Sequence, residues 1–356
     1  MFLNSLFLKQ FKDLLIVGLM AVLVIGLLEG GLRIFWPQPF KTVYFGQPPG
    51  LIDPDVGVIL RPGAKWMMQK PEFNTVFELS PEGFRDKVDH SLPVPFDTKR
   101  ILIIGSSHTL GAGVEYEGIW SVIFEKYLLD NHVKADVIKA GMNAFDTASS
   151  VRFVEKLFPR YKPNLVIIEL STAVIMSNPS YSETKPSVNA DGFIKIVSEE
   201  KHDLYFISVI KRLLRINDVF FANYNMKKGW GPILTVDSSS RKHQVEVTEQ
   251  WLARAAKYLK SQGTKLVVVT IPENTQMLIN ARKIKIPGID PQVNDRELEK
   301  FCKEQGIFWI SPLDYFSQQY LLQKKELYYR LDGHMNSLGH KALAEYVFRN
   351  LYSTLN

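Results

Sequence analysis

The chain has 356 residues, of which 46% are hydrophobic and 22% charged, and 43 Lys and Arg against 37 Asp and Glu give a formal net charge of +6. Its single cysteine, Cys302, excludes a disulfide framework and a zinc site built from cysteines. The apolar content is enough for a full core and excludes a mostly disordered chain. The basic residues are spread along the sequence, so no nucleic-acid partner is expected.

The most hydrophobic segment lies near the N-terminus. Leu14–Leu28 carry no charge, and the apolar character continues to Trp36. At about 1.5 Å per residue, residues 14–36 extend roughly 34 Å, which is enough to cross a bilayer core of about 30 Å. No small-residue cleavage site follows the apolar run, so we predict an uncleaved transmembrane signal anchor and not a signal peptide. The alternative is a helix buried in a protein core.

The charges that flank this segment predict its orientation. Lys9 and Lys12 precede it, which places residues 1–13 in the cytoplasm and exports the rest of the chain. Arg33 and Lys41 follow it and argue for the opposite orientation. We therefore expect a single-pass protein that contacts membrane lipid through its N-terminal helix.

Residues 37–98 are rich in proline and glycine and predict a stalk of extended or short-stranded chain that wraps the next domain without a core of its own. From residue 99 to 356 short apolar runs alternate with helical patterns, which is typical of βαβ units. We predict strands at Ile101–Ile104, Ala135–Ile138, Leu165–Leu170, Lys265–Ile271 and Ile307–Ile310, and helices near 117–130, 147–160, 244–262, 293–305 and 337–353. These elements indicate an α/β fold, a three-layer α/β/α sandwich with a doubly wound, flavodoxin-like parallel sheet.

A long insertion, about residues 172–243, interrupts this alternation. Within it, apolar residues between Phe206 and Ile216 share one helical face, opposite Lys211, Arg212 and Arg215. Such a helix either lies on anionic lipid or packs its apolar face on the domain. We expect the second arrangement.

Two elements carry residues suited to catalysis. The first predicted strand leads into Gly105-Ser106-Ser107-His108, which can present a serine at the carboxyl edge of the sheet. The glycines that follow fit neither phosphate-binding motif, so a nucleotide loop is disfavoured. Near the C-terminus, Asp332-Gly333-His334 precedes the last helix, and a histidine there can accept the serine proton while the aspartate orients its ring. By itself, this second element is equally consistent with a capped turn.

Together these elements resemble the SGNH/GDSL hydrolase family. The sequence from Gly105 to Val114 is similar to that family's first block, which implies that Ser107 is the nucleophile. Val137 to Gly141 resembles the second block, which assigns Gly141 to the oxyanion hole beside the Ser107 backbone N–H. The Asp332–His340 region resembles the last block, with His334 as base and Asp332 as its partner. The anchor and Gly83-Phe84-Arg85-Asp86 resemble membrane-anchored bacterial members, which implies the bacterial inner membrane and a periplasmic or extracellular domain.

The chain also departs from the family pattern in two places. Ser106 stands where the first block has aspartate, and Ala173 stands roughly where the third block has the asparagine that completes the oxyanion hole. Losing one oxyanion donor costs on the order of 10²–10³ in kcat. We hypothesise that Asn143 replaces it, with the hydroxyls of Ser171 and Thr172 as alternatives.

The resemblance implies a serine esterase or O-acyltransferase that acts on acyl esters of cell-envelope glycans or lipids through an acyl-serine. Transfer would call for a membrane-embedded acyl donor or polysaccharide machinery as partner. Ser106 and His108 are expected to line the pocket, and neither a cofactor nor a metal is expected. The alternative class is a catalytically degenerate scaffold or glycan-binding subunit of a membrane complex, because the two departures also fit a site that has lost its activity.

Overall fold

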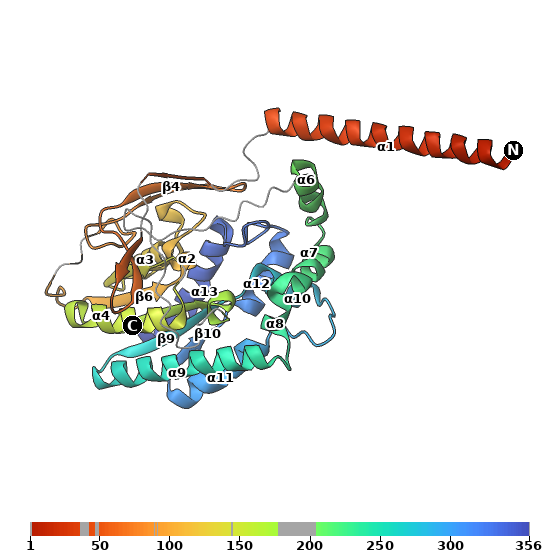
Figure 1. Ribbon diagram of the computed structural model, residues 1–356. Coiled ribbons are helices and arrows are strands. Elements are labelled where there is room, and N and C mark those ends of the chain that lie inside the picture. The colour runs from red at the N-terminus through yellow and green to blue at the C-terminus, as the bar shows by residue number, and fades with distance from the viewer. Residues whose placement is uncertain are drawn as a thin grey trace.

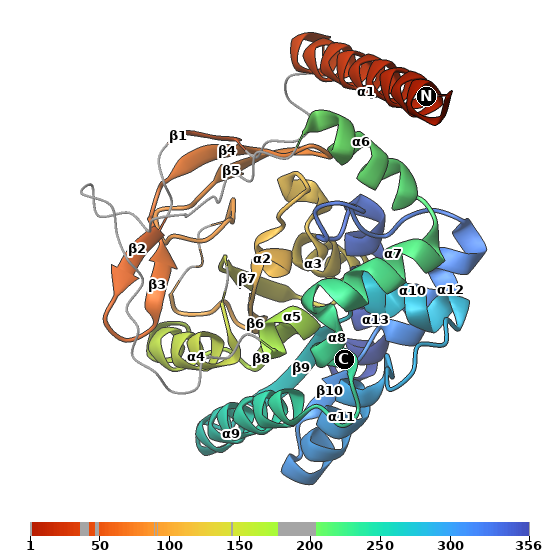
Figure 2. The same ribbon diagram turned by 45° about the vertical axis from the view of Figure 1, so that its right-hand side comes forward.

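The computed structural model describes residues 2–35, 43–46, 50–88, 90, 92–143, 145–176 and 204–355. Trp36, the predicted last residue of the anchor, and residues 177–203 of the predicted insertion lie outside the described residues. Figure 1 shows a long N-terminal helix beside a body of mixed helices and strands, and Figure 2 shows the same arrangement after a 45° turn.

A five-stranded parallel sheet forms the centre of the body. Its spatial order is β10-β9-β8-β6-β7. Read from β7 and numbered along the chain, this order is 2-1-3-4-5, the flavodoxin-like arrangement. The predicted strands are present with small differences at their ends: β6 (Lys99–Gly105), β7 (Ala135–Gly141), β8 (Leu165–Ser171), β9 (Lys265–Ile271) and β10 (Phe308–Ile310). Continuous aliphatic runs form these strands because both faces of the sheet are buried.

Helices cover both faces of this sheet and bury two separate cores. Leu102 and Ile104 of β6 face one core, and Ile101 and Ile103 face the other. The first core is completed by α4 (Thr147–Tyr161), α9 (Ser239–Ser261) and α11 (Val293–Gln305). The second core is completed by α3 (Trp120–Asp130), α10 (Asn274–Arg282), α12 (Leu313–Gln323) and α13 (Ser337–Leu355). The predicted three-layer α/β/α arrangement is therefore present.

Short strands fill the region predicted to be a stalk. One small sheet has the order β1 (Val43–Gly46), β4 (Lys65–Gln69), β5 (Asn74–Glu78), and a second pairs β2 (Gly50–Asp53) with β3 (Gly57–Leu60). Their buried side chains, such as Phe77 and Phe84, belong to the same core as α4. The boundary drawn at residue 98 therefore does not separate these strands from the domain's core.

The N-terminal helix α1 (Phe2–Phe35) stands apart from the sheet (Figure 1). Gln10–Phe35 have a mean hydropathy of 2.4 and none of that apolar window is buried in the protein, so the helix is long and apolar enough to span a membrane. The alternative of a buried core helix is wrong, because the leucines and valines of this segment are exposed.

The described part of the insertion is helical: α5 (Thr172–Ile175), α6 (Tyr205–Leu214), α7 (Asp218–Asn225), a short π-helical turn (Met226–Trp230) and α8 (Gly231–Leu234). The expectation that the apolar face of the 206–216 helix packs on the domain is wrong for much of that face. On that face, Ile210 and Leu213 of α6 and Ile216 just after it are 41%, 61% and 69% exposed. Periodicity predicted the amphipathic helix but does not determine what covers its apolar face.

Candidate active site

The proposed nucleophile stands at the carboxyl end of β6. The strand ends at Gly105, Ser106 caps the short helix α2 (Ser107–Leu110), and Ser107 is its first residue. The N–H of a first helical residue has no partner within its helix. This turn therefore presents both the hydroxyl and the backbone N–H of Ser107 at the edge where ligands of such sheets bind.

The structure brings the three predicted catalytic residues together. The Ser107 Oγ lies 2.8 Å from His334 Nε2, and His334 Nδ1 shares a hydrogen bond with Asp332 Oδ1. The His334 side chain is 21% exposed and that of Asp332 is 7% exposed. With Nδ1 protonated toward the aspartate, Nε2 accepts from the serine hydroxyl, which is the arrangement that general-base catalysis requires.

Two residues from the β4–β5 turn support this arrangement, and sequence reasoning missed both. Lys70 Nζ lies 2.5 Å from Asp332 Oδ2. Glu72 Oε2 accepts hydrogen bonds of 2.8 Å from the backbone N–H groups of Leu331 and Asp332. Burial would raise the pKa of Asp332, but the hydrogen bond and charge of His334, together with Lys70, lower it well below its ordinary value. Asp332 is therefore held as a carboxylate. No motif marks Lys70 or Glu72, which lie about 260 residues before Asp332 in the sequence.

Sequence analysis also did not predict a carboxylate that binds the turn between β6 and α2. Glu169 of β8 is fully buried and accepts from the Ser106 N–H at 2.7 Å, from the Ser106 Oγ at 3.0 Å and from the Thr109 Oγ1 at 2.9 Å. A Cβ at Gly105 would lie 2.4 Å from Glu169 Oε2, so only glycine fits beside this carboxylate. Burial raises the pKa of Glu169. The side chain of Ser106, predicted to line the pocket, is instead directed at Glu169.

His108, the other predicted pocket residue, lies beside His334. Its ring centroid is 5.2 Å from that of His334, and its Nδ1 is buried without a hydrogen-bond partner. Burial, followed by the neighbouring charge of His334, lowers the pKa of His108 well below its ordinary value. His108 is therefore a neutral ring at physiological pH and does not compete with His334 for the proton.

Apart from Ser107, the predicted oxyanion residues and their alternatives lie at the carboxyl ends of β7 and β8 or within two residues of them. A Cβ at Gly141 would lie 2.2 Å from the Leu110 backbone nitrogen, so the absence of a side chain lets β7 end directly against α2. Asn143 is exposed two residues later. The Ser171 hydroxyl accepts from the Val174 N–H at the start of α5 and also hydrogen-bonds the Glu273 carboxylate. The Thr172 hydroxyl donates to Gln276, so both alternative donors already have partners.

Buried polar groups surround Ala173, at the position where the family has asparagine. Glu273 Oε1 accepts from the Ala173 N–H at 3.1 Å, and burial raises the pKa of Glu273 to about 7. The adjacent Asn274 is 3% exposed, and neither atom of its amide has a partner. No sequence pattern singled out this end of β9.

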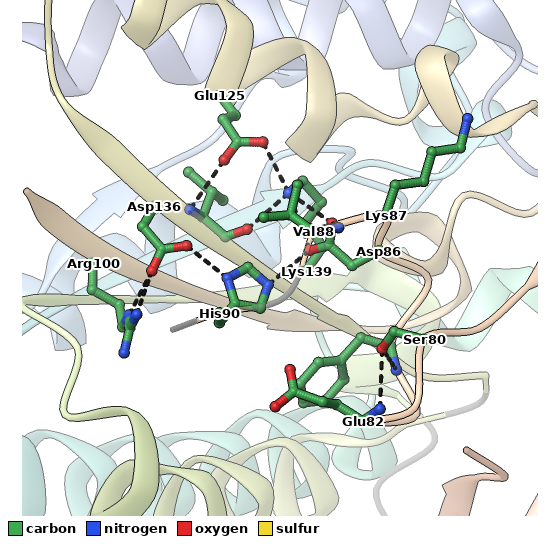
Figure 3. Close-up of polar contacts among 12 residues, drawn as sticks. Ser80, Glu82, Asp86, Lys87, Val88, His90, Arg100, Glu125, Asp136 and Lys139 are labelled. Atoms are coloured by element: carbon green, nitrogen blue, oxygen red, sulfur yellow. Dashed lines mark hydrogen bonds and ion pairs between the residues drawn. The ribbon is translucent and has the colours of Figure 1, made fainter. Parts of the chain in front are cut away.

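The Gly83-Phe84-Arg85-Asp86 motif braces the nucleophile loop from the N-terminal region. The buried guanidinium of Arg85 donates to the carbonyls of Leu110, Gly111 and Val114, and its burial lowers the pKa of Arg85 to about 10. The next residue, Asp86, belongs to a buried network of three carboxylates and three basic groups (Figure 3). Its other members are His90, Arg100, Glu125, Asp136 and Lys139.

No protein-family model matches the chain, and no curated protein matches it. Among solved structures it is similar to a crystal structure of TesA, at 15% identity and a TM-score of 0.43, covering 72% of this chain and 100% of that one. It is also similar to the psychrotrophic esterase EstA from Pseudoalteromonas sp., solved inhibited by monoethylphosphonate, at 13% identity and a TM-score of 0.41, covering 72% and 99% of the two chains. A lipase/acylhydrolase from Enterococcus faecalis gives 13% identity and a TM-score of 0.41, covering 72% and 97%. The assignment of a chemistry therefore depends on the residues of this chain.

Proposed function

We propose that this chain is a membrane-anchored serine ester hydrolase or O-acyltransferase of the SGNH/GDSL type that acts on acyl esters of envelope glycans or lipids. The observation that supports it is the hydrogen-bonded series Ser107 Oγ, His334 Nε2, His334 Nδ1 and Asp332 Oδ1. A serine hydroxyl beside a histidine that is itself oriented by a carboxylate can act as an activated nucleophile.

In the first half-reaction Ser107 Oγ attacks the ester carbonyl carbon, and its proton passes to His334 Nε2. Asp332 stabilises the imidazolium that forms. The backbone N–H groups of Ser107 and Gly141, with the Asn143 amide, hold the negative oxygen of the tetrahedral intermediate. The ester C–O bond then breaks, and His334 returns the proton to the departing alcohol, which leaves an acyl-serine.

In the second half-reaction His334 deprotonates the acceptor, which attacks the acyl carbon. The bond to Ser107 Oγ then breaks, and His334 returns the proton to that oxygen. Water as acceptor yields a carboxylic acid, whereas a sugar hydroxyl yields a new ester. The apolar helix α1 supports a location at a membrane. The flanking Lys9 and Lys12 favour residues 1–13 in the cytoplasm, and the family resemblance favours the outer face of the bacterial inner membrane for the domain. Membrane-embedded acyl-donor or polysaccharide machinery is the partner that the transfer reaction needs.

A fluorophosphonate probe on the detergent-solubilised full chain tests the proposal. We expect labelling of the wild type at neutral pH, none of Ser107→Ala, and full labelling of Ser261→Ala, an exposed serine at the end of α9. An unlabelled but folded wild type would instead identify the chain as a degenerate scaffold. In a separate reaction, unlabelled wild-type enzyme is given an ester substrate with and without a glycan acceptor. This distinguishes the two activities, because a transferase forms acylated glycan faster than free acid.

A further inference from the structure

Helix α6 and the turn after it carry an exposed apolar strip. Leu204, Ile207, Ile210 and Leu214 recur at helical spacing and are 43%, 38%, 41% and 46% exposed. The strip continues C-terminally through Leu213, Ile216, Val219 and Phe220, which are 39% to 69% exposed. Single exposed apolar side chains need no explanation, but a contiguous strip indicates a contact surface.

This strip is continuous with the membrane-spanning segment proposed above. Glu29 Oε2 of α1 accepts from the Phe206 N–H of α6 at 3.0 Å, and the Arg33 guanidinium lies 4.6 Å from the centre of the Tyr205 ring. Glu29 and Arg33 are the charged residues near the C-terminal end of α1. Because charged side chains mark the boundary of a spanning helix, these contacts place α6 at the level of the headgroups. In Figure 1 α6 runs across the axis of α1 and not along it.

Basic and aromatic side chains flank the strip. The Arg215 guanidinium and Lys228 Nζ lie 5.1 Å and 5.3 Å from the Tyr224 ring centre, and Lys227 beside them is exposed. Apolar residues next to Lys, Arg and Tyr form the composition that binds the interface of an anionic bilayer. The charge and the continuity with α1 both favour lipid over a protein partner.

The same helices lie close to the loop that holds Asp332 and His334. The positive charge of Arg212 in α6 acts on Glu72, whose carboxylate binds the N–H groups of Leu331 and Asp332. Asp218, at the start of α7, accepts from Arg330 at 2.8 Å. The surface that carries the strip therefore lies next to the catalytic loop.

We propose that the exposed strip of α6 and residues 216–220 is a second membrane contact, lying in the plane of an anionic lipid surface beside α1 and holding the Ser107–His334 site at headgroup level. This rests on the proposed membrane anchor. A site at that height takes acyl esters carried by lipids or by glycans that are still lipid-linked. The surface restricts the accessible substrates and adds no step to the chemistry.

The test uses the full chain in vesicles of phosphatidylcholine and phosphatidylglycerol, with an environment-sensitive fluorophore on single cysteines. Three exposed leucines on helices make matched sites: Leu213→Cys in α6, Leu23→Cys in α1 and Leu129→Cys at the end of α3, where the chain turns back to the amino end of β7. The native Cys302 is fully buried and burial raises its pKa to about 12, so it stays unlabelled.

We expect lipids with a deep spin label to quench position 23, lipids with a shallow spin label to quench position 213, and neither to quench position 129. Quenching at 23 without quenching at 213 would overturn the membrane contact while leaving the anchor intact. A blue-shifted but unquenched label at 213 would also overturn it, because protein would then cover the strip. Absence of quenching at 23 would overturn the anchor, and the inference with it.

A charge on the strip gives an independent measurement. We expect Leu213→Glu to lower turnover of an ester embedded in vesicles several-fold while leaving turnover of a soluble ester unchanged, and Leu129→Glu to change neither. Equal turnover of the embedded ester by Leu213→Glu and wild type would contradict the proposal. If the wild type turned over neither the embedded nor the soluble ester, the proposed function would be contradicted instead.

Discussion

Two histidine–aspartate clusters in this protein use the same chemical groups for different ends. At the carboxyl edge of the sheet, His334 binds one carboxylate through Nδ1 and faces the Ser107 hydroxyl with Nε2. In the other cluster, His90 binds Asp136 through Nδ1 at 2.6 Å and Asp86 through Nε2 at 3.1 Å, with its side chain 1% exposed (Figure 3). A ring with both nitrogens bound to carboxylates has no atom left for a substrate.

The difference lies in what surrounds the ring. Burial by itself would lower the pKa of His90, but the hydrogen bonds and charges of Asp136 and Asp86 outweigh it and raise that pKa to about 9. Arg100, Lys139 and Glu125 complete a balanced set of three positive and three negative groups. His90 is therefore a fixed cation in a buried network, and the histidine able to exchange a proton with a hydroxyl is the one with a single carboxylate.

The first prediction separates the two histidines by activity. We expect His334→Ala to lower kcat on a soluble ester about 10⁴-fold or more, because the hydroxyl loses its base. We expect His90→Gln to keep kcat per folded molecule within a few-fold of wild type. Steady-state kinetics with active-site titration measure both. Comparable losses in the two variants would mean that the buried network takes part in the chemistry.

A second prediction concerns the missing oxyanion donor on the catalytic side. We expect Asn143→Ala to lower kcat by roughly 10²–10³ with little change in KM, because the lost interaction forms in the transition state. Asn274→Ala is the matched control. Its amide is buried without partners, so its removal is expected to leave kcat unchanged and stability equal or higher. The reverse pattern would place the donor at the end of β9.

The third prediction concerns stability on the buried side. A pKa raised in the folded state stabilises the protein fully below the unfolded value, near 6.5 for histidine, and the stabilisation is lost as pH rises through the folded value of about 9. That difference corresponds to about 3 kcal/mol. We expect the free energy of unfolding of the full chain in detergent, measured in urea, to fall by about this amount between pH 6 and pH 10.

The variants for this measurement are His90→Gln and His243→Gln, which removes an exposed histidine of α9. The His90 variant should be less stable at pH 6 and show a flatter dependence on pH, whereas the His243 variant should follow the wild type. Parallel curves for all three proteins would show that His90 is not the group that titrates.

Sequence patterns predicted the fold better than they predicted the residues that hold the proposed catalytic residues in place. The five parallel strands and their helices follow from aliphatic runs and amphipathic periodicity, which are local. Helices α10 and α12 were not predicted. Nearly all of the side chains of α10 are buried, so it has no polar face to reveal its period. Ser107, Asp332 and His334 belong to motifs that resemble a known family, and the structure places them in hydrogen-bonding contact.

The residues that support the site and the buried network make their contacts with residues far away in the sequence. Glu169 reaches Ser106 across 63 residues, and His90 reaches Asp136 across 46. Neither pair has a local signature, because only the packed sheet brings its members together. The carboxylate that the family's first block carries beside its nucleophile is absent at Ser106, but one arrives there from β8 as Glu169. A single position that differs from the family pattern therefore does not show that a chemical group is missing, because a residue of the neighbouring strand can supply it.

The last prediction, with the smallest expected effect, concerns the ion pair between Lys70 and Asp332. It tests whether Asp332 needs a neighbouring cation, as the carboxylates of the buried network do. Lys70 Nζ binds the Asp332 oxygen that His334 leaves free, so it fixes the carboxylate's rotation and with it the imidazole ring. We expect Lys70→Met to lower kcat on the order of tenfold, the effect of one charge-assisted hydrogen bond of about 1.4 kcal/mol. KM should change little, because Lys70 acts through Asp332. Lys70→Arg, which keeps a cation there, should retain most of the wild-type kcat, and Lys65→Met, at an exposed lysine at the start of β4, should change neither kcat nor KM. An equal tenfold loss in Lys70→Arg would mean that Lys70 only packs the turn.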